Sequence, residues 1–436
     1  GRVTNFTIQN REQRITDNRP MSDKPIPEQR WMRVIFVAFV MYTIAFIDRT
    51  NISLAIPSMS RELHMDPAQA GSAAGIFFWG YIVLQIPGGY LASRWSAKRF
   101  VSILLIAWGL CSAATGFVHT WREFWWMRLL LGVTEGGVWP AVLVLLAHWF
   151  PRNERARANA YWMLCLPIAV IVSSPLSGWI LAHWNWRVLL ISEGLLPFVW
   201  LVIWLTQIVD HPHQAGWIST EECNYLEQSL QQESSLVVSK DSFLRTLLHP
   251  QVMVLIVVYF LINCGNYGYL FWLPSALEAA QKMGNVLVGV LQAVPYVLTA
   301  IGMVVVSRHS DRRRERRGHV AGALTWGGLF LLASVALSHR SPLLSFICIC
   351  LVGAGSYGGH GPFWAIPTET LPAEVSGSAM GLINAIGNLG GYFGPLAVGE
   401  IRKYTGNFVY AFGSLGVALL AASLFCRLLR KAPTQA

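Results

Sequence analysis

The sequence contains little charge. Only 13% of its 436 residues are Asp, Glu, Lys or Arg, whereas 54% are hydrophobic and the mean hydropathy is +0.44. A soluble globular chain carries about twice that charged fraction, about 25%. This shortage excludes an ordinary soluble protein and predicts a chain that crosses a membrane many times.

Cysteine is sparse and has no metal-binding pattern. The seven cysteines include no CxxC pair and no nearby histidine cluster, and most lie inside apolar runs. Small buried hydrophobic side chains explain them better than metal ligands or disulfides. The chain also lacks a nucleotide-binding motif and a nucleophile–base set, so we expect no enzyme activity, no metal and no bound cofactor.

Acidic residues are too few to balance the basic ones, which leaves a net charge of +10. The basic residues fall in the gaps between apolar runs, as topology-setting charges do, so we expect a lipid environment and no nucleic-acid partner. Every second gap is rich in Lys and Arg, for example Arg94 to Arg99, Arg152 to Arg157 and Arg308 to Arg317. Because such gaps face the cytoplasm, both termini are predicted to be cytoplasmic.

Apolar runs of spanning length dominate the remainder of the chain. We predict twelve transmembrane helices: 34–57, 70–92, 99–118, 124–149, 156–182, 187–208, 250–273, 284–306, 319–338, 341–365, 374–398 and 407–428. The predicted fold is therefore an all-α membrane protein. Residues 1–33 form an N-terminal cytoplasmic segment, and we expect 1–20, before the first methionine, to be a tag or gene-model extension.

The longest polar interruption, 209–249, divides the spans six and six. It predicts a cytoplasmic linker with a short amphipathic helix between an N-terminal bundle (34–208) and a C-terminal bundle (250–430), followed by a tail (431–436). A weak repeat supports two related halves, because WFPRNERARANA after the fourth span resembles TLPAEVSGSAMG after the tenth. Paired halves are typical of secondary transporters.

Two adjacent charges, Asp48 and Arg49, lie inside the first apolar run. Intramembrane charges are costly unless they face a protein interior or a water-filled path, so they mark candidate functional sites. Arg128 and Glu135 in the fourth span are two helical turns apart and share one face. If the faces of these two spans meet, two carboxylates and two guanidiniums share one cavity.

These four groups suit the binding of an anion together with protons. An Arg side chain stays charged and presents a planar fork that matches a carboxylate. A carboxyl group in a low-dielectric site can take up and release protons near neutral pH. A static salt-bridge network is the alternative, especially for Arg128, and Asp48 could serve only to hold Arg49. Glu193 lies nearer a helix end, which favours a structural role.

The second half offers mainly neutral polar groups. Asn384 and Asn388 lie four apart on one helix face, and helix–helix hydrogen bonding is the alternative to ligand contact for each. His360 could carry protons or contact a ligand, or it could be a hydrogen-bonded interior residue. In the second span, Tyr81 and Gln85 add possible polar contacts.

Several motifs together resemble the major facilitator superfamily and, within it, the anion:cation symporters. They are IDRTN (47–51), QIPGGY (85–90), MRLLLGVTEGG (127–137), HWFPRNERARANA (148–160) and FWAIPTE (363–369). The loop GGYLASRWSAKR (88–99) is similar to the superfamily's signature for stabilising one conformation. Gly89, Arg94 and Arg99 fit it, whereas Ser93 stands where an acidic residue is expected.

The resemblance implies bacterial inner-membrane permeases for sugar acids or aromatic acids, functional as monomers. It implies that Arg49 receives the substrate carboxylate and that Asp48 and Glu135 are protonation sites. Arg128 would join that network, while Tyr81 and Asn384 would touch substrate. Galactonate-type relatives have a Tyr in place of Phe46 and a Gln near Leu166, so a less hydroxyl-rich substrate is expected here.

We therefore expect proton-driven import of a small organic carboxylate by alternating access, with the proton as coupling ion. Proton-coupled efflux of a drug or metabolite is the first alternative, although a cationic drug would favour exposed carboxylates without Arg49. A transport-inactive sensor with the same fold is the second alternative. It would bind a ligand without moving it across the membrane.

Overall fold

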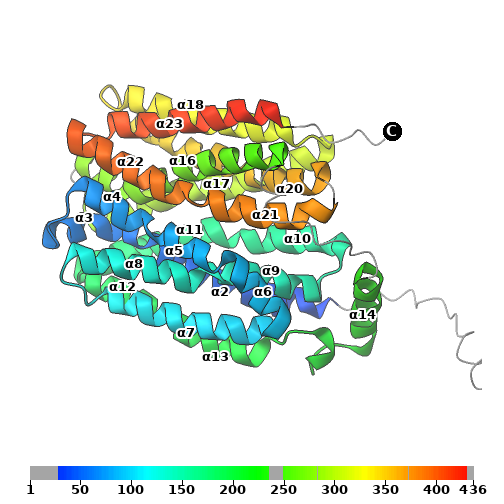
Figure 1. The fold of residues 1–436 in the computed structure, drawn as a ribbon. Helices are drawn as coiled ribbons and strands as arrows, with labels where there is room; N and C mark the ends of the chain where they lie inside the picture. The colour runs from blue at the N-terminus through cyan, green and yellow to red at the C-terminus, as the bar shows by residue number, and fades with distance from the viewer. Residues whose placement is uncertain (1–27, 235–248, 282, 372, 430–436) are drawn as a thin grey trace, which may run out of the picture.

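The computed structural model describes residues 28–234, 249–281, 283–371 and 373–429, and throughout these residues the regular structure is helical. Two helical bundles lie side by side, with their long axes nearly parallel (Figure 1). The prediction of an all-α membrane protein is confirmed. The predicted segments 1–20 and 431–436 lie outside the described residues, as does most of the second half of the predicted linker.

The N-terminal bundle contains six helical passes, several of them built from consecutive helices. They are η1 (Trp31–Ile35), α2 (Phe36–Thr50) and α3 (Ile52–Glu62); α4 (Pro67–Gly75), α5 (Phe77–Val83) and α6 (Gln85–Leu91); η2 (Ala92–Ser96) and α7 (Ala97–Thr115); α8 (Trp121–Gly136) and α9 (Val138–Trp149); α10 (Arg152–Met163) and α11 (Cys165–His183); and α12 (Trp186–Gly194) and α13 (Leu196–Gln207).

The C-terminal bundle repeats this arrangement with fewer breaks. Its helices are α16 (Pro250–Gln281), α17 (Asn285–Arg313), α18 (Arg317–Leu337), α19 (Pro342–Ser356), α20 (His360–Thr370), α21 (Ala373–Gly387), α22 (Gly390–Thr405), α23 (Val409–Phe425) and η4 (Cys426–Leu428). Between the bundles, η3 (Pro212–Gln214) and α14 (Thr220–Ser234) lie at the end of the molecule where the C-terminus emerges (Figure 1). We call this end the termini face.

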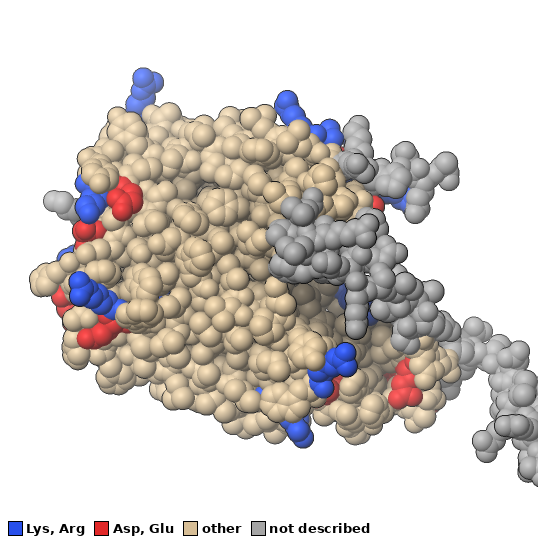
Figure 2. Space-filling view, viewed as in Figure 1, with Lys and Arg blue, Asp and Glu red and all other residues tan. Residues whose placement is uncertain are grey.

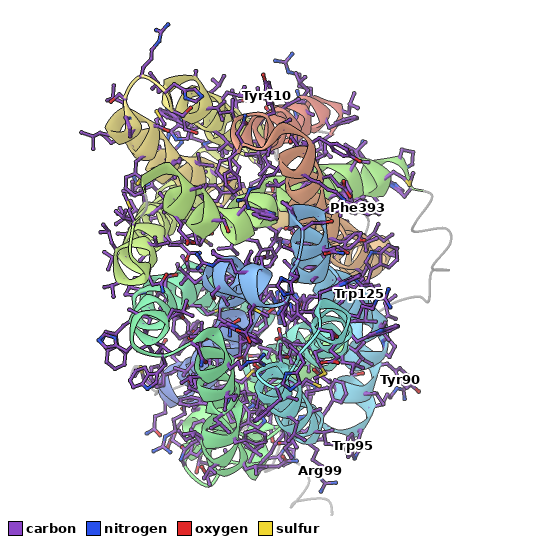
Figure 3. All side chains as sticks on the ribbon, turned by 90° about the vertical axis from the view of Figure 1, so that its left-hand side faces the viewer. Tyr90, Trp95, Arg99, Trp125, Phe393 and Tyr410 are labelled. Atoms are coloured by element: carbon purple, nitrogen blue, oxygen red, sulfur yellow. The ribbon has the colours of Figure 1, made fainter. Side chains whose placement is uncertain are left out.

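Most of the face seen in Figure 2 is free of charged residues between its two ends. Large apolar side chains are exposed on the perimeter, as at Tyr90, Trp95, Phe393 and Tyr410 (Figure 3). Within the described residues, ten helical stretches are long and apolar enough to span a membrane. The two other predicted spans correspond to α4–α6 and α21–α22. In water such a surface would be unstable, whereas lipid tails solvate it.

Polar contacts join the two bundles near the face opposite the termini. Buried Gln292 of α17 donates to the hydroxyl of Ser53 of α3 at 2.9 Å, and Asn285 donates to the carbonyl of Leu181 at 3.0 Å. An ion pair of 3.1 Å also connects Lys403 of α22 with Asp66 before α4. These bonds join the bundles at this face, which we call the sealed face.

Glycine residues allow α11 and α17 to approach closely where the two bundles meet at the sealed face. A Cβ atom on Gly178 of α11 would lie 2.5 Å from the carbonyl oxygen of Asn285. One on Gly289 of α17 would lie 2.3 Å from the carbonyl oxygen of Ser174. Two helix backbones therefore touch directly across the bundles, which only small residues allow.

At the termini face, Arg30 fastens α14 to the N-terminal bundle. Its guanidinium lies 2.6 Å from Glu222 of α14 and 2.7 Å from Glu154 of α10, and the side chains of Arg30 and Glu222 are almost fully buried. Tyr225 of α14 also donates to Glu154 at 3.1 Å. The helix between the two halves is thus part of the N-terminal bundle's packed structure.

Candidate functional site

Arg49 is the centre of the candidate site. It lies at the end of α2, next to the break at Asn51, and only 3% of it is exposed. Its Nη2 atom is 3.2 Å from Oε2 of Glu135 on α8, which is 1% exposed. A buried guanidinium and carboxylate compensate each other, and removing either partner leaves an unpaired buried charge.

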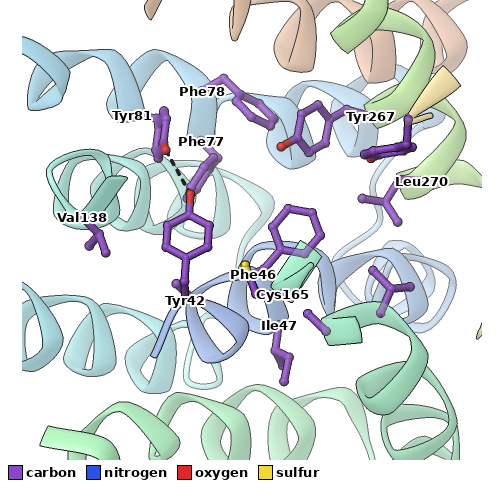
Figure 4. Packing of buried hydrophobic residues seen from close by; sticks show 14 of the residues in the cluster. Tyr42, Phe46, Ile47, Phe77, Phe78, Tyr81, Val138, Cys165, Tyr267 and Leu270 are labelled. Atoms are coloured by element: carbon purple, nitrogen blue, oxygen red, sulfur yellow. Dashed lines mark hydrogen bonds between the residues drawn. The ribbon is translucent and has the colours of Figure 1, made fainter. Parts of the chain in front are cut away.

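Aromatic rings surround the Arg49 guanidinium. Its Cζ atom lies 4.6 Å from the ring centroid of Tyr81, 4.9 Å from Phe77, 5.6 Å from Phe46 and 6.0 Å from Tyr42. The hydroxyls of Tyr42 and Tyr81 are hydrogen-bonded at 3.3 Å (Figure 4). Ring faces attract a cation and exclude competing water, so the site keeps Arg49 charged, buried and oriented.

A cavity adjoins Arg49 between the two bundles. Its walls come from both halves and are mostly aromatic or amide in character. The lining residues are Tyr42, Phe46, Arg49, Tyr81, Trp139, Met163, Leu166, Tyr259, Asn263, Tyr267, Tyr357, His360, Trp364, Asn384 and Asn388. Such a lining suits a small ligand, because it combines apolar walls with a few fixed polar groups. We call it the central cavity.

The C-terminal wall of the central cavity contains the predicted residues His360 and Asn384. The His360 ring stacks on Tyr357 with centroids 5.1 Å apart, and its Nδ1 atom has no hydrogen-bond partner within the described residues. Asn384 donates to Gln85 of α6 at 2.9 Å, and Gln85 donates to the carbonyl of Gly136. The Asn384–Gln85 bond thus crosses between the bundles beside the cavity.

Asp48 faces away from the central cavity, although it neighbours Arg49 in sequence. Its carboxylate accepts hydrogen bonds from the indole of Trp108 at 2.8 Å and the hydroxyl of Ser112 at 2.7 Å, both on α7. Within the described part of the chain, that carboxylate forms no ion pair with Arg49. The helical offset of about 100° between neighbours accounts for the different directions.

Arg128 likewise does not line the central cavity. Its guanidinium points at backbone carbonyls, with Nη2 3.3 Å from the oxygens of both Arg49 and Ala74 and Nη1 3.5 Å from that of Asp48. It therefore braces the C-terminal end of α2, where carbonyls lack helical partners. The four charges expected in one cavity are divided: Arg49, which is paired with Glu135, lines the central cavity, while Asp48 and Arg128 line a second, smaller one.

The other predicted residues lie away from the central cavity. Gly89 approaches Pro140, where an added Cβ atom would lie 3.5 Å from the ring, and the side chains of Arg94 and Arg99 are exposed. The carboxylate of Glu193, on α12, accepts from Ser177 of α11 at 2.8 Å. It thereby joins two passes of the N-terminal bundle.

Asp210 supplies a contact that the sequence motif did not reveal. Its carboxylate accepts from the backbone N–H of Lys98 at 2.9 Å and from the hydroxyl of Ser96, the residue that caps α7. An acidic group at a helix N-terminus is stabilising. Ser93, at the position expected to be acidic, donates only to the carbonyl of Tyr90 among the described residues. The acid at this helix end therefore comes from after the sixth pass.

Comparison with known proteins decides the family. The model of the Major Facilitator Superfamily matches residues 38–395, which is most of the chain. The chain belongs to this superfamily. Superfamily membership and the relatives described below identify a transporter rather than an enzyme, as the sequence predicted.

Named relatives of this superfamily member span nearly the whole chain. A protein from Agrobacterium vitis named "Putative tartrate transporter" is 32% identical and covers 92% of this chain and 90% of its own length. The quinolone resistance transporter of Acinetobacter baumannii is 28% identical, covering 89% and 91%. The inward open structure of the xylose transporter XylE from E. coli aligns with a TM-score of 0.74 at 13% identity, covering 93% and 98%. That last likeness establishes the shared fold.

Proposed function

We propose that this superfamily member imports a small organic anion together with protons. The observation that carries the proposal is the buried ion pair between Arg49 and Glu135 at the edge of the central cavity. A substrate carboxylate and the Glu135 carboxylate can both bind the same guanidinium. Protonation of Glu135 releases Arg49, so proton binding and anion binding favour each other.

This competition gives the cycle its direction. Higher proton concentration outside protonates Glu135 and leaves Arg49 free for the substrate carboxylate. Lower proton concentration inside removes that proton, and the restored Glu135 carboxylate displaces the substrate. Asp48 supplies a second protonation site, so up to two protons accompany each anion. A monoanion carried with two protons makes transport electrogenic.

The cavity walls favour a monocarboxylate with a flat or partly apolar body. Arg49 is the one Lys or Arg among the lining residues, which leaves a second carboxylate without a cation. Tyr42, Tyr81, Tyr259 and Trp139 offer ring faces for stacking. The side chains of Asn263, Asn384 and Asn388, together with His360, offer neutral hydrogen bonds to a polar substituent.

The positive-inside pattern supports a cytoplasmic position for both termini in a bacterial cell. The sealed face is then external, and the structure corresponds to a state with the outside closed. Transport would proceed by rocking of the two bundles around the central cavity, with the Gln85–Asn384 and Gln292–Ser53 bonds re-formed in each cycle. One chain supplies both cavity walls, which supports a monomeric transporter.

Efflux by proton antiport is the second candidate function, supported by the similarity to a quinolone resistance transporter. The central cavity argues against a cationic cargo, because its one buried cation, Arg49, would repel it. The single-Arg cavity is equally compatible with a sensor that binds an anion without moving it. Flux measurements separate these alternatives.

Uptake into proteoliposomes tests the proposal. The panel should contain an aromatic monocarboxylate such as 4-hydroxyphenylacetate, tartrate, galactarate and a cationic quinolone ester. We expect an inward proton gradient to stimulate uptake of the monocarboxylate most strongly and a protonophore to abolish the stimulation. If no organic anion shows proton-stimulated uptake, the proposal is wrong. Binding without flux would identify a sensor.

A further inference from the structure

A second cavity lies entirely within the N-terminal bundle. It is small and separate from the central cavity. The residues around it come from α2, α3, α7, α8, α12 and the α2–α3 junction: Asp48, Asn51, Ile52, Ser112, Thr115, Arg128, Leu131 and Leu190. Because one bundle supplies all of them, rocking of the two bundles need not open or close this chamber.

The chamber presents polar groups that lack protein partners. Asn51 is 3% exposed, and within the described residues neither Nδ2 nor Oδ1 makes a well-formed hydrogen bond. The Nε atom of Arg128 is also unpaired there. Leaving such groups unsatisfied costs about 1–3 kcal/mol each. This polar space has room for about one ordered water molecule, which needs 2–4 polar partners.

Glu193 borders this chamber from the side of the sealed face. It follows Leu190 by three residues on α12, so the two share a helix face, and it is 3% exposed. Its Oε1 atom accepts from Ser177, Oε2 has no partner in the described part of the chain, and the Asn51 amide lies beside the carboxylate.

No described Lys or Arg forms an ion pair with Glu193. Asp48 of α2 lies within electrostatic reach of Glu193 across the chamber, and Arg128 of α8 also lines the chamber. Ser177 of α11, with Ser112 and Thr115 of α7, contributes hydroxyl groups. A buried carboxyl group without a cation is stabilised by holding a proton.

We propose that Glu193 is a proton carrier that delivers protons through the Asn51 chamber to Asp48. The proton leaves the Glu193 carboxyl group, passes along water beside Asn51 and binds the Asp48 carboxylate. Glu193 is then reprotonated from the sealed face, where α12 begins. Protons would thus reach the site by a path within one bundle, apart from the path of the anion. This inference rests on proton-coupled transport as proposed above.

The geometry explains how the delivered proton affects the anion site. Arg128 lies at the inner end of the chamber and donates to the backbone carbonyls of both Asp48 and Arg49. Neutralising Asp48 changes the electrostatic balance around Arg128, which braces the segment that holds Arg49. A proton in the chamber can therefore affect the central cavity without entering it.

Replacing Glu193 with Gln tests the proposal in proteoliposomes. We expect the initial rate of proton-driven anion uptake to fall by about 10-fold or more. Counterflow exchange of the same anion at equal pH should stay near the wild-type rate, which a merely structural defect would not allow. Glu193→Asp should restore part of the driven rate. Glu400→Gln in α22 is the matched control and should leave both rates unchanged.

Asn51→Leu gives an independent test, because it replaces the polar amide in the chamber with an apolar side chain of similar shape while keeping every carboxylate. Asn51→Leu should also slow proton-driven anion uptake while leaving counterflow exchange unchanged. If Glu193→Gln does not fold, the result for Asn51→Leu tests the proposal alone. If either variant folds and shows proton-driven uptake at the wild-type rate, the inference is wrong. If wild-type protein itself shows no proton stimulation, the proposed function fails instead.

Discussion

The two bundles share an architecture but bury different chemistry. In the spans of the N-terminal bundle, five charged side chains are at most 3% exposed: Asp48, Arg49, Arg128, Glu135 and Glu193. In the described spans of the C-terminal bundle, the buried polar side chains are neutral amides and hydroxyls, together with His360. Under the proposed proton-coupled transport, coupling would reside in the N-terminal bundle, while the C-terminal bundle completes the cavity.

The largest expected effect comes from the cation of the N-terminal bundle. Arg49→Lys keeps the charge but replaces a planar fork with a point charge, so two-point binding of a carboxylate is lost. A charge-assisted hydrogen bond contributes about 1.5–3 kcal/mol, which corresponds to an affinity loss of roughly 10- to 150-fold. A binding measurement with the purified protein gives this loss of affinity. Wild-type affinity would remove Arg49 from the docking role and weaken the contrast between the bundles.

Glu135→Gln should uncouple transport rather than abolish binding. The neutral amide cannot be deprotonated, so it cannot take Arg49 back from the substrate inside the cell. We expect accumulation against a gradient to disappear while counterflow exchange survives, both measured in proteoliposomes with and without a pH gradient. Thr134→Ser, at the neighbouring position, is the control. Unchanged accumulation in Glu135→Gln would show that the proton couples elsewhere.

Substitutions in the C-terminal wall should have the smallest effects and should leave coupling intact. His360→Asn and Tyr357→Phe each remove a neutral contact, for which about 0.5–1.5 kcal/mol, or a 2- to 13-fold change in affinity, is expected. The ratio of protons to substrate, measured from reversal potentials, should not change. A changed ratio in His360→Asn would place coupling chemistry in both bundles.

Much of the architecture could be predicted because each span is a local property of the chain. Length and hydropathy located the helices, and the helical period placed Arg128 and Glu135 on one face. The contact between Arg49 and Glu135 was inferred from charge and is present at 3.2 Å. Their roles in binding and coupling stay predictions.

The partners of Asp48 and Arg128 could not be predicted in the same way. Asp48 is satisfied by Trp108 and Ser112, which are uncharged residues in an unremarkable apolar run. Arg128 bonds to backbone carbonyls, which leave no trace in the sequence. The Asp210 contact with the start of α7 and the Arg30 contact with α14 similarly depend on which helices meet in space. Such pairings are set by tertiary packing and not by local pattern.

The glycine contacts between α11 and α17 have a consequence for how closure of the sealed face responds to salt. Gly178 and Gly289 join the bundles by backbone contact, and the partly exposed Lys403–Asp66 pair, which joins α22 to the start of α4, is of a kind that contributes at most about 1 kcal/mol. Ionic strength screens exposed charges but leaves close packing unaffected. Closure of the sealed face should therefore be nearly independent of external salt.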